Sequence, residues 1–197
     1  MFLLVGVYRI SMLSIFGSAM LQGSGNNVTV LRTTNLTVNV ITFKSDGWHL
    51  RDLQLDAIEE RTSGAFVYSA ASYASVTNVS VAHQYIGFDL DGSWHVELQN
   101  IYAYDGTPHE TALGGAVIRL GNRRYTGPIN IRGLTAKPTS GNRQPSSGIT
   151  MENVDVVSIS NALTIWHKHN IVISPSGLQF AALTEISNSC FDTSETG

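Results

Sequence analysis

Two carboxylates in residues 87–92 have a type and spacing that suit hydrolysis of a glycosidic bond. Asp89 and Asp91 alternate with Phe88 and Leu90, a pattern typical of a β-strand with one buried face. If the apolar side chains point inward, both carboxylates point outward, roughly 6.5 to 7 Å apart. An inverting glycosidase holds its two carboxyl groups ~6.5 to 9.5 Å apart. We therefore predict Asp89 and Asp91 as the catalytic pair, the alternative being an ordinary solvated strand face.

A line of side chains that suits sugar binding runs beside this pair. With Gly64, Gly87 and Gly115 aligned, one outward column contains Tyr68, Asp91 and Arg119, and aligning Ala162 with these glycines adds Trp166. The adjacent column contains Phe66, Asp89, Val117 and Thr164. Aromatic rings cover the apolar faces of pyranose rings, and charged groups bond their hydroxyls. We predict Tyr68, Arg119, Trp166 and Phe66 as substrate-binding residues. The alternative for Asp91 and Arg119 is a surface ion pair that contributes little.

Other kinds of chemistry have little support. His167 and His169 alternate around Lys168 without a third metal ligand nearby, so no metal and no cofactor is expected. The net charge of −3 and the absence of a Lys/Arg cluster argue against nucleic acid as a partner. Cys190 is the only cysteine, which excludes a disulfide within the chain and favours a small buried side chain.

The elements that must position these residues come from a repeat, which recurs about every 20 to 35 residues. In most copies, Asn or Asp precedes a β-branched or aliphatic residue. The copies begin at Asp52, Asn78, Asn100, Gly133 and Asn153, with a degenerate one at 186–189. Between them run second strands that begin at Gly64, Gly87, Gly115 and Asn161. Self-similarity at this period predicts a solenoid, in which no unit buries its apolar face alone.

The repeated Asn and Asp residues are expected to be structural. Asn tolerates a left-handed backbone at a sharp corner, and coils stacked roughly 4.8 Å apart align such side chains into ladders. No stretch has a sustained helical period, and only 14% of the residues are charged. The sequence therefore predicts an all-β protein, with residues 1–197 as one solenoid domain.

The first 21 residues contain a single charge, Arg9. Glycine and serine interrupt them well short of the ~18 apolar residues that a membrane span needs, so no membrane partner is expected. Residues 6–11 and 13–15 alternate like strands. We interpret them as the first coil, with a signal peptide as the alternative.

Several segments resemble the coils of pectate-lyase-like right-handed parallel β-helices, and most closely those of bacteriophage tailspikes. They are GVYRI at 6–10, LQGSG at 21–25, TVL at 29–31, WHLRDLQLD at 48–56 and ISNSCFDT at 186–193. The resemblance implies a single-stranded right-handed β-helix, a homotrimer, a bacterial surface polysaccharide as partner, and a virion or extracellular location. Both ends lack the capping elements of a solenoid, so a fragment of a longer chain is expected.

Three functions remain open. The first is recognition of an extracellular polysaccharide with hydrolysis by groove carboxylates. The second is a non-catalytic structural or adhesive shaft. The third is a polysaccharide lyase of the pectate type, although no cluster of Asp residues beside a suitable Arg matches the calcium site and base of those enzymes. New reducing ends, binding without turnover and unsaturated products would distinguish the three.

Overall fold

The computed structural model describes residues 1–106, 115–137, 147–165, 167, 169–174 and 183–192, in which all regular structure is β-strand. The strands form one 11-stranded and one 7-stranded sheet. The larger sheet contains β1 (Gly6–Ile10), β3 (Met20–Gln22), β4 (Thr29–Thr33), β6 (His49–Ala57), β8 (Ala74–Ala82), β10 (Val96–Tyr104), β12 (Ile129–Ala136), β14 (Val156–Ser160), β15 (Leu163–Ile165), β17 (Leu183–Ser187) and β18 (Cys190–Asp192). The smaller sheet contains β2 (Leu13–Ile15), β5 (Ile41–Phe43), β7 (Ala65–Ser69), β9 (Ile86–Leu90), β11 (Ala116–Leu120), β13 (Ser147–Met151) and β16 (His169–Ile173).

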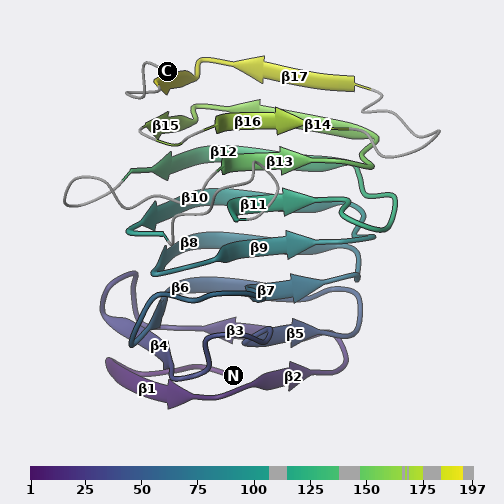
Figure 1. Ribbon diagram of the computed structural model, residues 1–197. Coiled ribbons are helices and arrows are strands. Elements are labelled where there is room, and N and C mark those ends of the chain that lie inside the picture. Colours follow the sequence, from purple (N-terminus) through teal and green to yellow (C-terminus); the bar gives the residue numbers. More distant parts are fainter. Residues whose placement is uncertain (107–114, 138–146, 166, 168, 175–182, 193–197) are drawn as a thin grey trace.

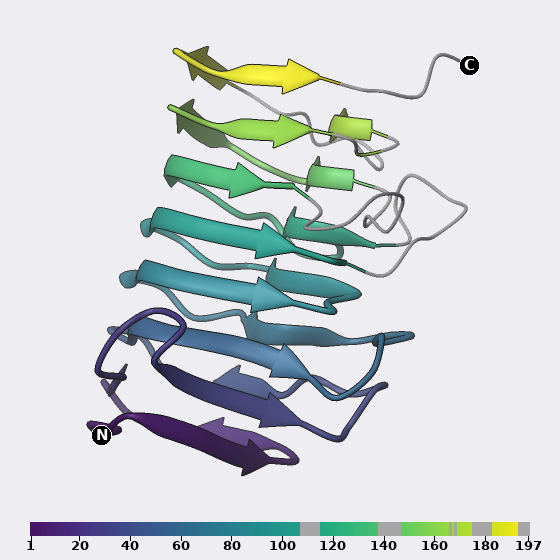
Figure 2. The ribbon, with the colours of Figure 1, turned by 90° about the vertical axis from the view of Figure 1, so that its left-hand side faces the viewer.

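The chain winds alternately through the two sheets, and each turn stacks on the one before it. β7, β9 and β11 are neighbours in the smaller sheet, while the intervening β8 and β10 are neighbours in the larger one. The strand pairs are parallel, as between β8 and β10. Figures 1 and 2 show the coils stacked from the N-terminal coil to the last strands. The predicted all-β parallel β-helix is confirmed.

Aliphatic side chains at equivalent positions of successive coils fill the space between the sheets. Leu50, Val76, Leu98 and Ile131 are paired in register, and each is fully buried. The smaller sheet contributes a facing column that includes Val67, Phe88 and Ile118. Removing apolar surface from water stabilises the fold by roughly 25 cal/mol per Å². No single coil buries its apolar face alone, so this stabilisation depends on stacking.

A left-handed residue bends each long strand of the larger sheet. Asp52, Asn78, Asn100 and Gly133 have φ values of 57°, 55°, 53° and 68°. The Asn78 amide also donates a hydrogen bond of 2.9 Å to Asp52 Oδ1 on the preceding coil. The structural role predicted for these repeated residues is confirmed.

The predicted positions of two later copies of the repeat, at Asn153 and Asn161, are wrong. Asn153 lies between β13 and β14, where its amide donates a 2.8 Å hydrogen bond to the Gly121 carbonyl. Asn161 occupies the corner instead, with a φ of 52°. The strand that follows it, β15, joins the larger sheet and not the smaller one.

The N-terminal residues form strands, as the alternation predicted. β1 pairs with β4, and β2 pairs with β5. No helix in the described part of the chain is long and apolar enough to cross a membrane. Cys190 is exposed, so its predicted burial is wrong.

Replacement of Asn78 tests the corner. Asn78→Ala should lower the free energy of unfolding by about 1–2 kcal/mol, since alanine disfavours a left-handed backbone. Asn78→Gly loses the same hydrogen bond to Asp52 but adopts this backbone freely, so it should cost less. Urea denaturation of the two variants gives the comparison. Equal losses would show that backbone conformation is not what asparagine contributes at this corner.

Candidate active site

The predicted acidic and basic residues gather on the outer face of the smaller sheet. Strand register places Tyr68 of β7 beside Asp89 of β9, Asp89 beside Arg119 of β11, and Arg119 beside Thr150 of β13. The predicted column of Tyr68, Asp91 and Arg119 is therefore wrong at its middle position, where Asp89 stands. Asp91 lies just beyond the end of β9.

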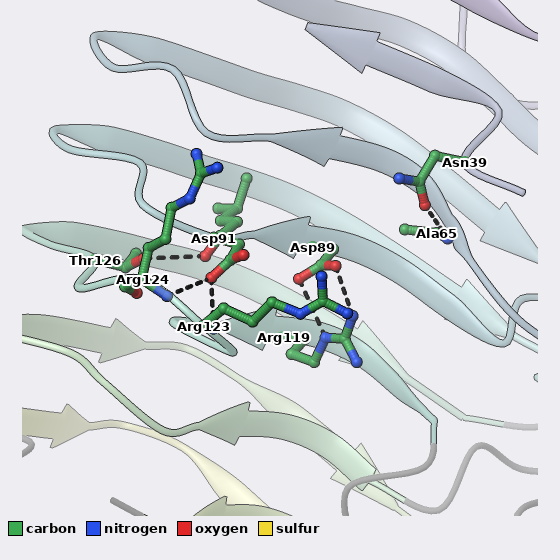
Figure 3. Close-up of polar contacts among 9 residues, drawn as sticks. Asn39, Ala65, Asp89, Asp91, Arg119, Arg123, Arg124 and Thr126 are labelled. Carbon is green, nitrogen blue, oxygen red and sulfur yellow. Dashed lines mark hydrogen bonds and ion pairs between the residues drawn. The ribbon is translucent and has the colours of Figure 1, made fainter. Parts of the chain in front are cut away.

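Asp89 and Arg119 form a two-pronged ion pair across adjacent coils. Arg119 Nε donates to Asp89 Oδ1 at 3.1 Å, and a terminal guanidinium nitrogen donates to Oδ2 at 2.6 Å (Figure 3). Asp89 is only 4% exposed. Burial alone would lower the pKa of Arg119, but the hydrogen bond and charge of Asp89 raise it above its ordinary value. Arg119 is therefore a permanent cation, and both Asp89 oxygens have a partner.

Asp91 organises the turn that follows β11. Its Oδ1 accepts hydrogen bonds from the backbone N–H groups of Arg123 and Arg124 at 2.7 and 2.8 Å (Figure 3). None of the described residues donates a hydrogen bond to Oδ2. Thr126 secures the same turn by accepting the Gly92 N–H at 2.7 Å. Asp91 is 3% exposed, so the open outward position predicted for the pair is wrong for both aspartates.

A third carboxyl group, Glu152, belongs to this site and was not predicted. Leu90, Leu120 and Met151 are paired in register, so the residues after them, Asp91, Gly121 and Glu152, form the next level of the stack. Burial raises the pKa of Glu152, the charge of Arg119 lowers it, and Asp89 and Asp91 raise it again. The net direction is upward, so Glu152 holds its proton to a higher pH than an ordinary glutamate.

Gly121 separates the two carboxyl groups of this level. It has a φ of 68°, and a Cβ here would lie 2.3 Å from the Asn153 carbonyl oxygen. Only glycine fits, so no side chain stands between Asp91 and Glu152 in the stack. At ~4.8 Å per coil, their backbones lie about 10 Å apart. Sequence inspection missed Glu152 because its relation to Asp91 depends on the register of three coils.

A hollow of about 340 Å³ continues the site toward the N-terminal coils. It is lined by Phe43, Lys44, Asp46, Tyr68, Ala70, Ala71 and Arg124. Burial, and then the charge of Asp91, raise the pKa of the half-buried Tyr68 phenol. Tyr68 thus links the hollow to the carboxyl groups and retains its hydroxyl proton.

Of the other two predicted binding residues, the structure contradicts one and does not describe the other. Phe66 is fully buried in the core, with the Arg61 guanidinium carbon 5.0 Å from its ring centre, so its predicted exposure is wrong. Trp166 lies outside the described residues, and the alignment that placed it beside Tyr68 fails because β15 belongs to the larger sheet. In the described residues, no group of three His, Cys, Asp or Glu side chains is arranged to hold a metal ion.

Comparison with solved structures identifies similar folds. A catalytic domain of a GH87 α-1,3-glucanase in complex with tetrasaccharides has a TM-score of 0.54 and 14% identity, over 96% of this chain and 40% of that one. The ORF18 protein of Geobacillus virus E2 has a TM-score of 0.54 and 12% identity, over 96% and 52%. The A-module of the Azotobacter vinelandii mannuronan C-5 epimerase AlgE4 has a TM-score of 0.48 and 14% identity, over 95% and 67%.

The two similarities with a TM-score of 0.54 support the parallel β-helix fold. The resemblance inferred from the strand segments is thereby confirmed for the fold. The chain spans only 40% and 52% of the lengths of the first two proteins. No protein-family model and no curated protein matches the sequence.

The ion pair gives a stability prediction. Arg119→Met leaves the Asp89 carboxylate buried without its partner and should cost about 3 kcal/mol of unfolding free energy, since Arg119 is itself mostly buried. Asp89→Leu combined with Arg119→Met removes both charges and should recover most of that loss. Chemical denaturation of the single and double variants forms a double-mutant cycle. A double variant as unstable as Arg119→Met would contradict the pairing.

Proposed function

We propose that this β-helix binds a bacterial surface polysaccharide on the outer face of its smaller sheet and hydrolyses it. The observation that carries the proposal is the arrangement of Glu152, which has a raised pKa, lies two coils from Asp91 and is within reach of the charges of Asp89 and Arg119. A carboxyl group with a raised pKa near an ionised partner is the arrangement that glycoside hydrolysis requires.

In this proposal Glu152 is the general acid and Asp91 is the general base. Asp91 accepts a proton from water through Oδ2, and the water oxygen forms a bond to the anomeric carbon. The bond to the glycosidic oxygen breaks as Glu152 gives that oxygen its proton. Backbones two coils apart, about 10 Å, are compatible with the ~6.5 to 9.5 Å between carboxyl groups that an inverting enzyme uses, so we propose inversion of configuration.

Arg119 and Tyr68 have binding roles in the same proposal. Because Asp89 fixes the guanidinium of Arg119 and raises its pKa, Arg119 does not serve as the proton-abstracting base of a lyase. This weighs against the lyase alternative. The Arg119 charge instead stabilises the carboxylate that Glu152 becomes after proton transfer. Tyr68 offers its ring to a sugar in the adjoining hollow.

The similar structures support the kind of ligand. The GH87 α-1,3-glucanase has a fold of this kind and is described with bound tetrasaccharides. The other protein with a TM-score of 0.54 is from a virus. We therefore propose a polysaccharide partner and a virion or extracellular location. A homotrimer remains a prediction from the tailspike resemblance, and analytical ultracentrifugation of the purified chain would test it.

A second candidate function is a non-catalytic adhesive or structural shaft. It is favoured by the contacts of Asp89 and Asp91, because Arg119 occupies both oxygens of one and a backbone turn occupies one oxygen of the other. Such contacts hold coils together whether or not chemistry takes place.

A screen for depolymerisation separates these functions. The folded chain is incubated with bacterial capsule and lipopolysaccharide preparations, α-1,3-glucan and mannuronan. New reducing ends without an unsaturated product support hydrolysis, and an unsaturated product would indicate a lyase. If the chain binds one of these polymers without shortening it, the adhesive function replaces our proposal.

Glu152→Gln should reduce hydrolysis at least about a hundredfold, because an amide of the same shape cannot donate the proton. Asp91→Asn should have a similar effect while keeping the Oδ1 acceptor for the turn. Release of reducing ends, with thermal unfolding as the check on folding, measures both. The matched control is Glu97→Gln, the same change at an exposed residue of β10 in the other sheet. Unchanged activity in Glu152→Gln would contradict the assignment.

A further inference from the structure

The outer face of the larger sheet contains a second hollow, separate from the carboxyl groups of the smaller sheet. Its volume is about 310 Å³, and Asn26, Asn27, Ser80, Tyr102, Tyr104 and Lys137 are among the residues that line it. It lies along β8 and β10, whereas Asp89 and Arg119 belong to strands of the other sheet. This volume lies at the lower end of the range usual for ligand sites and suits a small glycan fragment.

A segment from an earlier coil builds one wall of this hollow. Residues 23–28 connect β3 to β4, and Gly25 donates a backbone hydrogen bond of 3.0 Å to the Asp52 carbonyl in β6. The segment extends past β6, so that the Asn26 and Asn27 side chains reach Ser80 in β8. Figure 2 shows it as the dark blue arc before β4, rising along the stack.

The floor of the hollow is a prearranged set of polar groups. Ser80 is fully buried, and its hydroxyl donates to the Asn26 side-chain oxygen and lies 3.1 Å from that of Asn27. Tyr104 also lines the hollow, and its pKa is raised, first by burial, so its phenol keeps its proton. An amide that uses its oxygen in this way still has two N–H donors for a ligand.

An exposed aromatic ring completes the site. Tyr102 is paired in register with Ser80 and Thr135, so its ring lies in the same outward column, and it is 39% exposed. Among the described residues that line the hollow there is no carboxylate, and Lys137 is the one that carries a charge. A ring beside neutral amides and hydroxyls is the combination that recognises a pyranose, whose faces are apolar and whose rim carries hydroxyls.

We propose that this hollow is a second, non-catalytic glycan-binding site, in which a pyranose stacks on Tyr102 and its hydroxyls bond the amides of Asn26 and Asn27. This inference goes beyond the proposed function and does not rest on it. Where one polymer reaches both sheets, a second point of attachment raises its effective concentration at the carboxyl groups.

Side-chain amide signals test the site directly. Uniformly ¹⁵N-labelled chain is titrated with three probes: methyl α-glucopyranoside, methyl α-galactopyranoside and glucuronate. We expect at least one of them to shift the amide signals of Asn26 and Asn27 in a saturable way. A preference for glucuronate would show that the charge of Lys137 takes part in recognition. A preference for a neutral probe would show that Lys137 lies at the edge of the site without contacting the sugar.

Variants separate this site from the catalytic proposal. Tyr102→Ala should weaken the binding about tenfold, as expected for loss of one aromatic contact, and Tyr102→Phe should retain it. Tyr73→Ala, at an exposed tyrosine outside the hollow, and Glu152→Gln should both leave the titration unchanged. Absence of saturable shifts at Asn26 and Asn27 with all three probes, or equal binding by Tyr102→Ala, would overturn the inference, whatever the hydrolysis assays show.

Discussion

The parallel backbone ladder between successive coils determines which side chains meet in this molecule. Its hydrogen bonds fix each strand against its neighbour residue by residue. Leu50, Val76 and Leu98 therefore stack in one column inside the helix. Tyr68, Asp89 and Arg119 stack in one column on the outer face. A slip of one residue would exchange these faces and bury the charges. The apolar columns make any such slip costly, and the geometry of the acidic site follows from them.

On this framework, charge is neutralised locally. Asp89 meets Arg119 on the adjacent coil, and Asp91 receives two backbone N–H groups of the next turn. A buried carboxylate without such partners would cost several kcal/mol. Glu152 has a different environment, because burial raises the pKa of its carboxyl group, Arg119 lowers it, and the charges of Asp89 and Asp91 raise it again. The protonated form of Glu152 is thus favoured more than in an ordinary glutamate, which suits the acid role in acid–base chemistry.

The fold and the corner residues could be predicted because each leaves a local sequence signal. Alternating strands mark the coils, and Asn78 or Asn100 marks a left-handed corner. The alignment of Gly64 with Gly87 was wrong because the two glycines have different structural roles. Gly64 has a positive φ. Gly87 stands two positions further along its own coil than Gly64 does, and there a Cβ would lie 2.5 Å from the Val117 carbonyl oxygen. Aligning the two exchanged Asp89 for Asp91. Burial of Phe66 and the approach of Glu152 depend on packing between coils, for which a single sequence offers no local signal.

Burial, together with the charges that stacking brings near it, holds the pKa of the Glu152 carboxyl above that of an ordinary glutamate. A carbon-detected NMR titration of that carboxyl in the folded chain measures its pKa directly and needs no substrate. We predict a pKa above the ordinary glutamate value, and a shift back toward that value in Asp91→Asn, where one opposing charge is absent. A pKa at or below the ordinary value in the folded protein would contradict the account.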